Sequence, residues 1–501
     1  MSGARCDETA DGIGGKMDGK MEARLRNFIG GEYVEPVEGR YLDKFSPATA
    51  EKIYELPDSS ELDVVQAVQS AQKAFAGWSK LKTQERSQIL TRVAELIERD
   101  LELLARAESE DVGKPLELAK TLDIPRAALN FRFFASAVLH KQEMASDMDG
   151  EAINYVLRQP VGVAGLIAPW NLPLYLLTWK IAPALACGNT VVCKPSEWTS
   201  KSAFMLGRIL NEAGLPAGVC NIILGRGEPA GSYLVQHPGV PLISFTGGTA
   251  TGEKIQCLAA PHVKKLSLEL GGKNATIVLK DVDLAKVVPQ VARASFLNQG
   301  EICLCGSKIL VQEDIYPAFV EELVRHVESL KVGDPLDPES FMGPLVSQAH
   351  YGKVTQLLEM AKKDGGKVIT GGTRPELPEK LKSGYFLRPT LIADLNNCSD
   401  IHQTEIFGPV VSINSFKYPH EAVKWANNSP YGLSASIWTK NLTLAHKMAA
   451  DLRVGTVWVN TWLKRDLRMP FGGMKASGLG REGGHHSLDF FTETKTVCVQ
   501  L

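Results

Sequence analysis

"VGVAGLIAP" at residues 161–169 and "NTVVCKP" at residues 189–195 decide the fold class of this chain. Each is a short apolar run that ends at a proline. Similar runs end at glycine or at a loop in "VCNIIL" (219–224), "LISFTGG" (242–248) and "KKLSLELGG" (264–272). Helix-length segments lie between these runs, for example 201–213 and 249–260. Short apolar strands that alternate with helices predict an α/β fold, with a parallel sheet covered by helices on both faces.

The loops that follow these predicted strands are the expected place of chemistry. Ligands of parallel α/β sheets bind at the carboxyl ends of the strands, where the connecting loops lie. Four such loops stand out: "PWNLPL" (169–174), "KPSEWTS" (194–200), "FTGGTATG" (245–252) and "ELGGKN" (269–274). We therefore expect the functional residues to lie in or next to these loops.

The rest of the chain is expected to hold further helices and a second α/β unit. Apolar residues recur at helical spacing in 61–78, and again between Ile89 and Leu104. From about Asn274 a new alternation of strands and helices begins, which indicates a second unit facing the first. The first residues mix Gly, Asp, Glu and Lys without an apolar stretch, so residues 1–26 are predicted to be a disordered extension.

Composition excludes several function classes. The 55 Lys and Arg residues nearly balance the 57 Asp and Glu residues, so neither nucleic acid nor an anionic membrane is an expected partner. No window reaches the roughly 18 uninterrupted apolar residues of a membrane span, which predicts a soluble protein. The 9 cysteines are odd in number and scattered, which favours free thiols in a reducing compartment and hence the cytoplasm.

The stretch "NQGEICLCG" (298–306) holds two cysteines behind a glycine-bearing turn. Zinc sites need about four ligands, and no second Cys or His pair follows at short spacing, so no metal is expected. Most cysteines are simply buried, but a reactive thiolate needs a lowered pKa and access, which backbone amides of such a turn can provide. A general base is then needed for hydrolysis, and Glu269 in "KLSLELGG" is either that base or a strand-end glutamate facing solvent.

Seven motifs, taken together and in order, resemble the NAD(P)-dependent aldehyde dehydrogenase superfamily. They are "PWNLPL", "GNTVVCKPSE", "FTG", "ELGGKN", "NQGEICLC", "EIFGPV" and "PFGGMKASGLGREGG". The resemblance runs from about Asn27 to Leu501 and implies an aldehyde dehydrogenase-like fold. That fold has a Rossmann-type NAD-binding domain (27–146 and 161–269), an α/β catalytic domain (270–470) and a β oligomerisation arm (147–160 and 485–501).

The resemblance also implies the catalytic roles. Cys303 matches the nucleophile of the family, Glu269 matches the residue that activates the hydrolytic water, and the side chain of Asn171 matches an oxyanion donor beside the backbone N–H of Cys303. Cys305 is then a neighbour that either lines the substrate tunnel or forms a disulfide with Cys303 under oxidation.

NAD rather than NADP is the implied cofactor, because a carboxylate at Glu197 would accept the ribose hydroxyls and repel a 2′-phosphate. The resemblance assigns cofactor binding to Lys194, Ser196, Glu197, Gly247, Gly248, Glu405, Phe407 and Trp170. Three positions depart from the usual pattern: Gly248 stands for a serine, Glu301 for a glutamine and Lys308 for an arginine. The glycine-rich "GRGEPAG" (225–231) lacks fingerprint spacing and is interpreted as a turn.

The substrate depends on two arginines. A semialdehyde with a distal carboxylate needs cations at the tunnel, preferably arginines, and Arg126 and Arg465 are candidates. The alternative for "KRDLR" is a solvated charge cluster paired with Asp466. The sequence around both arginines resembles that of the family branch that oxidises 2-aminomuconate and 2-hydroxymuconate semialdehydes. The resemblance implies a role in tryptophan (kynurenine) catabolism or in aromatic ring-cleavage pathways. In that branch, matching arginines bind the substrate carboxylate; the amino and hydroxy substrates remain open.

The sequence leaves two other functions open. One is a sister specificity for retinal, betaine aldehyde or aliphatic aldehydes, which would leave the two arginines without a task. The other is a non-catalytic, crystallin-like protein, against which the intact Cys303, Glu269 and Asn171 argue. Strand-like patterns in "EAINYVLRQPVG" (151–162) and "DFFTETKTVCVQL" (489–501) match the oligomerisation arm of the family and imply a homo-oligomer, a dimer or tetramer.

Overall fold

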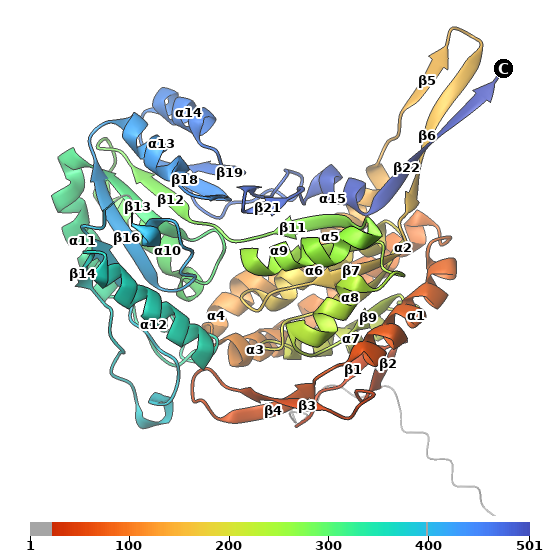
Figure 1. The fold of residues 1–501 in the computed structure, drawn as a ribbon, viewed down its shortest axis with the longest axis horizontal. Coiled ribbons are helices and arrows are strands. Elements are labelled where there is room, and N and C mark those ends of the chain that lie inside the picture. Colours follow the sequence, from red (N-terminus) through yellow and green to blue (C-terminus); the bar gives the residue numbers. More distant parts are fainter. Residues whose placement is uncertain (1–22, 397–398) are drawn as a thin grey trace, which may run out of the picture.

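The computed structural model describes residues 23–396 and 399–501, in which two separate sheets each carry their own hydrophobic core (Figure 1). Most of the predicted disordered extension, residues 1–22, lies outside the described residues. Its last residues are ordered, because Arg24 forms an ion pair with Glu55 and Leu25 is buried. The ordered chain therefore begins before the predicted boundary at residue 26.

The first sheet has the five predicted strands as its parallel centre, in the order β9-β8-β7-β10-β11. Their bounds are β7 Val163–Ile167, β8 Thr190–Lys194, β9 Cys220–Ile222, β10 Leu242–Thr246 and β11 Lys265–Glu269. Antiparallel strands extend both edges: β1 (Asn27–Ile29) and β2 (Glu32–Val34) on one side, and β21 (Gly478–Leu479) on the other. Strands β8, β9 and β10 are buried along their whole length, as expected for a sheet covered on both faces.

Helices cover this sheet and position its loops. They are α1 Glu61–Trp78, α2 Thr83–Arg99, α3 Leu101–Val112, α5 Ile124–Ala137, α6 Pro173–Ala186, α7 Lys201–Glu212, α8 Ser232–Gln236 and α9 Thr249–Ala259. The periodic stretch from Ile89 to Leu104 is divided between α2 and α3, because Asp100 leaves the helical conformation with ψ 17°. Between α3 and α5 the chain forms α4 (Leu116–Leu118) and a π-helical turn, η1 (Ala119–Asp123). A hairpin of β3 (Tyr41–Phe45) and β4 (Lys52–Pro57) precedes α1.

The second sheet has the order β14-β15-β16-β13-β12-β18-β19 and is parallel except for β14. Its strands are β12 Asn274–Val278, β13 Gly306–Gln312, β14 Lys367–Thr370, β15 Thr390–Ala393, β16 Val410–Phe416, β18 Ser434–Trp438 and β19 Thr456–Val459. Its helices are α10 Leu284–Phe296, α11 Tyr316–Glu328, α12 Gln348–Lys363, α13 Pro419–Asn427 and α14 Leu442–Asp451. The short loop 270–273 leads from β11 of the first sheet directly to β12, so the carboxyl end of β11 faces the second unit.

A three-stranded antiparallel sheet projects from the body of the molecule (Figure 1). It consists of β5 (Ala145–Met148), β6 (Ala152–Pro160) and β22 (Thr492–Gln500), the last of which follows α15 (Gly484–Phe490). Alternate residues of β6 are exposed, which leaves apolar side chains of this sheet uncovered. Within the described part of the chain, every helix is too short or too polar to cross a membrane.

Candidate active site between the two sheets

The turn before Cys303 has an unusual backbone. Asn298, Gln299 and Gly300 all have positive φ angles, of 52°, 59° and 70°. A Cβ at Gly300 would lie 2.5 Å from the carbonyl oxygen of Gly408, so only glycine fits there. After the turn, Asn274 Nδ2 donates to the carbonyl oxygens of Cys303 (2.7 Å) and Cys305 (3.0 Å). The backbone at Cys303 is therefore fixed by the tight turn before it and by the hydrogen bonds from Asn274.

A cavity of about 190 Å³ opens at Cys303 and is lined from both sheets. From the first sheet it takes Trp170, Asn171, Gly247 and Gly248, and from the second unit His350, Lys353, Glu405 and Phe407. The structure thus brings together the expected nucleophile, the expected oxyanion donor and several expected cofactor residues. His350 and Lys353 were missed, since the start of α12 carries no motif beyond an ordinary helix pattern.

Asn171 lies in the loop between β7 and α6, and the residue is 3% exposed. Its Nδ2 donates to the carbonyl oxygen of Glu301 at 2.8 Å, which ties it to the turn before Cys303. A carboxamide has two N–H donors, so one remains for a ligand in the cavity. The position fits the expected oxyanion role.

Glu269 lies at the end of β11 and is buried, with 5% of its surface exposed. Its Oε1 has no hydrogen-bond partner among the described residues, and a Cβ at Gly472 would lie 2.7 Å from that atom. Burial raises the pKa of Glu269 well above its usual value, and the neighbouring Glu482 raises it further. The solvent-facing alternative is therefore wrong: Glu269 is a buried carboxyl with the pKa shift typical of a general base.

The charge environment of Cys303 differs from the sequence-based expectation. Burial raises the pKa of its thiol, and Glu269 and Glu405 raise it further, whereas Arg465 opposes them. A lowered pKa was expected from the amides of the turn, but burial beside two carboxyl groups outweighs them. Attack by this sulfur would be helped by a group that accepts the thiol proton.

Cys305 is not part of the cavity wall. It is 5% exposed, packs in the core of the second unit, and directs its sulfur to the carbonyl oxygen of Leu297 at 3.8 Å. Burial raises its pKa to about 12. Its side chain therefore lies in the core beneath the loop, and its expected place in the wall of the substrate tunnel stays a prediction.

A second cavity, of about 340 Å³, lies at the carboxyl ends of β7, β8 and β10. It is lined by the expected residues Lys194, Ser196, Glu197, Gly247 and Gly248, and it shares Trp170 with the cavity at Cys303. Lys194 is buried and its Nζ lies 3.8 Å from Glu197. Gly248 precedes α9 with no side-chain cap, so the first N–H groups of that helix face the cavity uncapped.

The stretch interpreted as a turn is kinked and leads into α8. Within Gly227–Gly231, Glu228 has extended backbone angles of φ −119° and ψ 127°, and Gly227, Glu228 and Gly231 line the larger cavity. The glycines were the sequence signal that could have placed this stretch at the cavity, but their spacing differs from a dinucleotide-binding fingerprint.

Arg126 and Arg465 come from distant parts of the chain and meet at one aromatic ring. Their guanidinium carbons lie 5.6 and 5.5 Å from the ring centre of Trp179. Arg126 Nε donates to Asn130 at 3.1 Å, but its Nη2 is buried without a hydrogen-bond partner among the described residues. Burial lowers the pKa of Arg126, and the charge of Arg465 contributes to that shift. Two cations beside the same ring suit an anionic group that contacts both, and neither of them lines the cavity at Cys303.

The rest of the "KRDLR" stretch behaves as the alternative predicted. Arg468 is 81% exposed in its side chain and pairs with Asp466 at 2.6 Å. Arg465 instead stacks on Phe471, 3.6 Å from its ring centre, and is half-buried. The solvated-cluster interpretation therefore holds for Arg468 and fails for Arg465.

The chain is similar to known proteins over nearly its whole length. The model of the aldehyde dehydrogenase family matches residues 33–497. The chain belongs to the aldehyde dehydrogenase family. It is similar to the 2-aminomuconic semialdehyde dehydrogenase of Bos taurus, with 50% identity over 95% of this chain and 98% of that protein. It is also similar to the 2-hydroxymuconic semialdehyde dehydrogenase of Pseudomonas sp. (strain CF600), with 45% identity over 95% and 99% of the two chains.

Among solved structures, an indole-3-acetaldehyde dehydrogenase of P. syringae in complex with NAD+ has the same fold. The TM-score is 0.93 at 36% identity, covering 96% of this chain and 97% of that one. The expected aldehyde dehydrogenase fold is thereby confirmed, and the enzyme class is an oxidoreductase that acts on aldehydes.

Proposed function

We propose that this aldehyde dehydrogenase oxidises 2-aminomuconate or 2-hydroxymuconate 6-semialdehyde to the dicarboxylate. The observation that carries the proposal is the pair Arg126 and Arg465 at Trp179, with a buried, unpartnered N–H on Arg126. A substrate carboxylate would satisfy that donor and offset the mutual repulsion of the two cations. The names of the bovine and Pseudomonas relatives agree with this substrate class.

In the proposed mechanism, Glu269 in its ionised form accepts the proton of the Cys303 thiol, and the sulfur bonds to the aldehyde carbon. The carbonyl oxygen becomes an oxyanion, held by the free N–H of Asn171 Nδ2 and by the backbone N–H of Cys303. When bound, NAD supplies the hydride acceptor that converts this adduct to a thioester. Glu269 then loses its first proton to solvent and removes a proton from water, which attacks the thioester. The carboxylate leaves, and Glu269 returns the second proton to the expelled Cys303 sulfur, which restores the thiol.

The described residues fit NAD. Lys194, Ser196 and Glu197 would hold the adenosine ribose, and Glu197 disfavours a 2′-phosphate. The uncapped start of α9 at Gly247 and Gly248 suits the pyrophosphate. Glu405 and Phe407, beside Trp170 and Cys303, would hold the nicotinamide ribose.

The domain roles and the assembly are part of the same proposal. Residues 27–146 and 161–269 form the NAD-binding domain, 270–470 the catalytic domain, and 147–160 with 485–501 an arm that joins a homo-oligomer. The described free cysteines fit a reducing compartment such as the cytoplasm. A neutral substrate such as retinal, betaine aldehyde or an aliphatic aldehyde is less favoured, because it would leave the Arg126 donor unsatisfied.

The test compares NADH formation from 2-hydroxymuconate semialdehyde with that from a neutral aldehyde of matched chain length. Arg126→Ala is expected to lower kcat/KM for the semialdehyde about a hundredfold, with little effect on the neutral aldehyde. Arg465→Ala should lower kcat/KM for the semialdehyde at least as much and should affect the neutral aldehyde less, because the Arg465 charge also acts on the Cys303 thiol. Arg468→Ala, from the same stretch but in an exposed ion pair, is the matched control and should leave both rates unchanged. Equal rates on both substrates, insensitive to Arg126 and Arg465, would contradict the proposal.

A further inference from the structure

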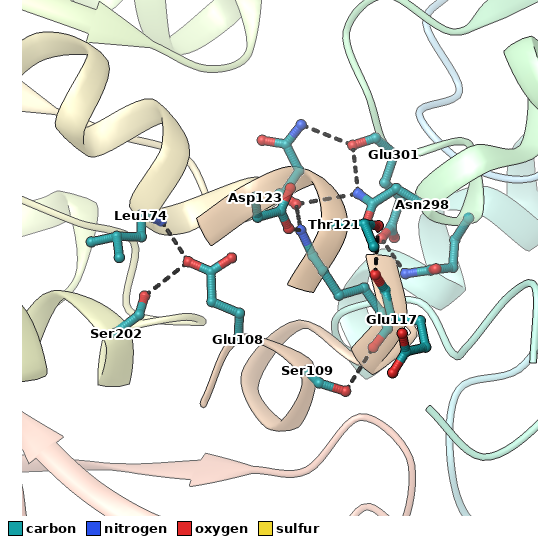
Figure 2. Close-up of polar contacts among 12 residues, drawn as sticks. Glu108, Ser109, Glu117, Thr121, Asp123, Leu174, Ser202, Asn298 and Glu301 are labelled. Atoms are coloured by element: carbon teal, nitrogen blue, oxygen red, sulfur yellow. Dashed lines mark hydrogen bonds and ion pairs between the residues drawn. The ribbon is translucent and has the colours of Figure 1, made fainter. Parts of the chain in front are cut away.

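A buried polar cluster lies behind the Asn171 loop (Figure 2). Its charged members are Glu108 on α3, Lys114 in the loop that follows, and Asp123 at the end of η1, and all are 0% exposed. None of them lines either cavity. Breaking buried charge pairs is costly, yet such pairs add little net stability over apolar packing, so stability is a weak reason for their presence.

Lys114 connects this cluster to the active site. Its ammonium group forms a short ion pair with the carboxylate of Asp123 and donates to the carbonyl oxygen of Asn171 at 2.8 Å. The ammonium thus reaches the main chain of the residue whose side chain is the proposed oxyanion donor.

The Asn171 loop depends on such contacts, because β7 ends at Ile167 and α6 begins only at Pro173. Asn298 Nδ2 donates to the same carbonyl of Asn171 at 3.2 Å and to the carbonyl of Glu301 at 3.3 Å. Figure 2 shows Asn298 and Glu301 on one side of Asp123, with Glu108 and Leu174 on the other. Lys114 therefore completes a frame that fixes Asn171 relative to the nucleophile.

Glu108 holds the other end of the same loop. Its Oε1 accepts the backbone N–H of Leu174 at 2.7 Å and the hydroxyl of Ser202 at 3.1 Å, as drawn in Figure 2. It replaces a cap for α6, since Leu172 at the N-cap position offers no side-chain acceptor. Burial, and next the charge of Asp123, raises the pKa of Glu108 to about 8. Burial raises the pKa of Asp123, and the charge of Lys114, its ion-pair partner, opposes that shift.

We propose that Lys114, oriented by Asp123, is a positioning residue for the oxyanion donor Asn171. The inference rests on the proposed role of Asn171, but it does not depend on which aldehyde is the substrate. Loss of the Lys114 contact would let the loop shift and misplace the Asn171 amide, and displacements of about 1 Å can cost up to a hundredfold in rate.

The test uses Lys114→Met combined with Asp123→Asn, so that no unpaired buried charge remains. Two reactions of Cys303 are compared, neither of which uses NAD or the semialdehyde. In the first, the thiol attacks p-nitrophenyl acetate, forms an oxyanion at the ester carbonyl and expels p-nitrophenolate. In the second, the thiol displaces iodide from iodoacetamide, and no oxyanion forms. We expect the first rate to fall about tenfold and the second to change by less than about twofold.

Lys44→Met is the matched control, because Lys44 is also buried and donates to two backbone carbonyls, of Phe45 and Asp111. It should change neither rate. In an Asn171→Ala background, the Lys114/Asp123 change should add nothing, because it acts through Asn171.

Several outcomes would contradict the inference, and they can be told apart from a failure of the proposed function. If Asn171→Ala slows ester hydrolysis but the Lys114/Asp123 variant does not, the positioning role is wrong and the role of Asn171 stands. Equal losses in both reactions, or a loss that persists without the Asn171 side chain, would indicate a structural role only. If Asn171→Ala itself has no effect, both the oxyanion assignment and the inference fail. Failure with the semialdehyde alone would count only against the proposed substrate.

Discussion

At the scale of single residues, Glu269 is coupled to a second carboxyl group. Glu482 raises the pKa of Glu269, while Lys180, which donates to Glu482 Oε1 at 2.9 Å and to Ser244 at 3.0 Å, lowers it. As a general base, Glu269 acts only when it is ionised. Its raised pKa therefore predicts that turnover rises with pH, until the carboxyl is fully ionised.

Glu482→Gln tests this coupling. The change removes a like charge but keeps an oxygen that can accept from Lys180, so the pKa of Glu269 falls. We expect the rising limb of the pH profile of kcat to move to lower pH. Glu269→Gln should reduce kcat by roughly a hundredfold or more at every pH. The profile is measured as the rate of NADH formation in a series of buffers from acid to alkaline pH. An unshifted profile in Glu482→Gln would contradict the coupling.

At the scale of elements, Gly248 lies directly before α9 and departs from the family pattern, which usually has a serine there. The residue has φ −71° and ψ 148°, which any residue can adopt, and a Cβ there would meet no atom within 4 Å. A serine would therefore fit, and its hydroxyl could both cap α9 and donate to a phosphate oxygen.

Gly248→Ser is expected to tighten NAD binding by about tenfold, the effect of one hydrogen bond to a charged group. Binding can be followed by the fluorescence of Trp170 and Trp198, which line the larger cavity. Gly248→Ala is the control, because it adds the Cβ without the hydroxyl and should leave the affinity nearly unchanged. Weaker binding by the serine variant would show that the bare glycine amide is needed at the phosphate.

At the scale of the whole molecule, the projecting sheet of β5, β6 and β22 has two different faces (Figure 1). Ile153, Tyr155 and Leu157 alternate along β6 and are 40%, 37% and 41% exposed, so they share one apolar face. On the opposite face Arg158 pairs with Glu143 and Asp489. An exposed apolar face on a projecting sheet is typical of an interaction surface.

Leu157→Glu should therefore reduce the proposed homo-oligomer to smaller species, because it buries a charge in the subunit contact. Light scattering during gel filtration measures this directly. Thr494→Glu adds the same charge on the face of Arg158, its partner in the strand pairing, and should leave the mass unchanged. A monomeric wild-type protein would contradict the assembly proposal.

The sequence by itself determined the parallel sheet and the loops that carry chemistry. Buried strands have continuous apolar runs, and the glycines and prolines that end them are local signals; both can be recognised without a structure. The motifs around Cys303, Glu269 and Asn171 are equally local, which is why the family was recognised from them. The division of Ile89 to Leu104 into two helices was missed, because both helices share one apolar pattern that continues across Asp100.

Only the tertiary structure decided which polar groups are buried and which of them meet. Arg126 and Arg465 are far apart in sequence and adjacent at Trp179, and Lys114 reaches Asn171 from another loop. The same holds for the raised pKa of Cys303 and the core position of Cys305. The physical reason is that burial and charge coupling depend on distances through space, whereas a sequence pattern reports only the order of residues along the chain.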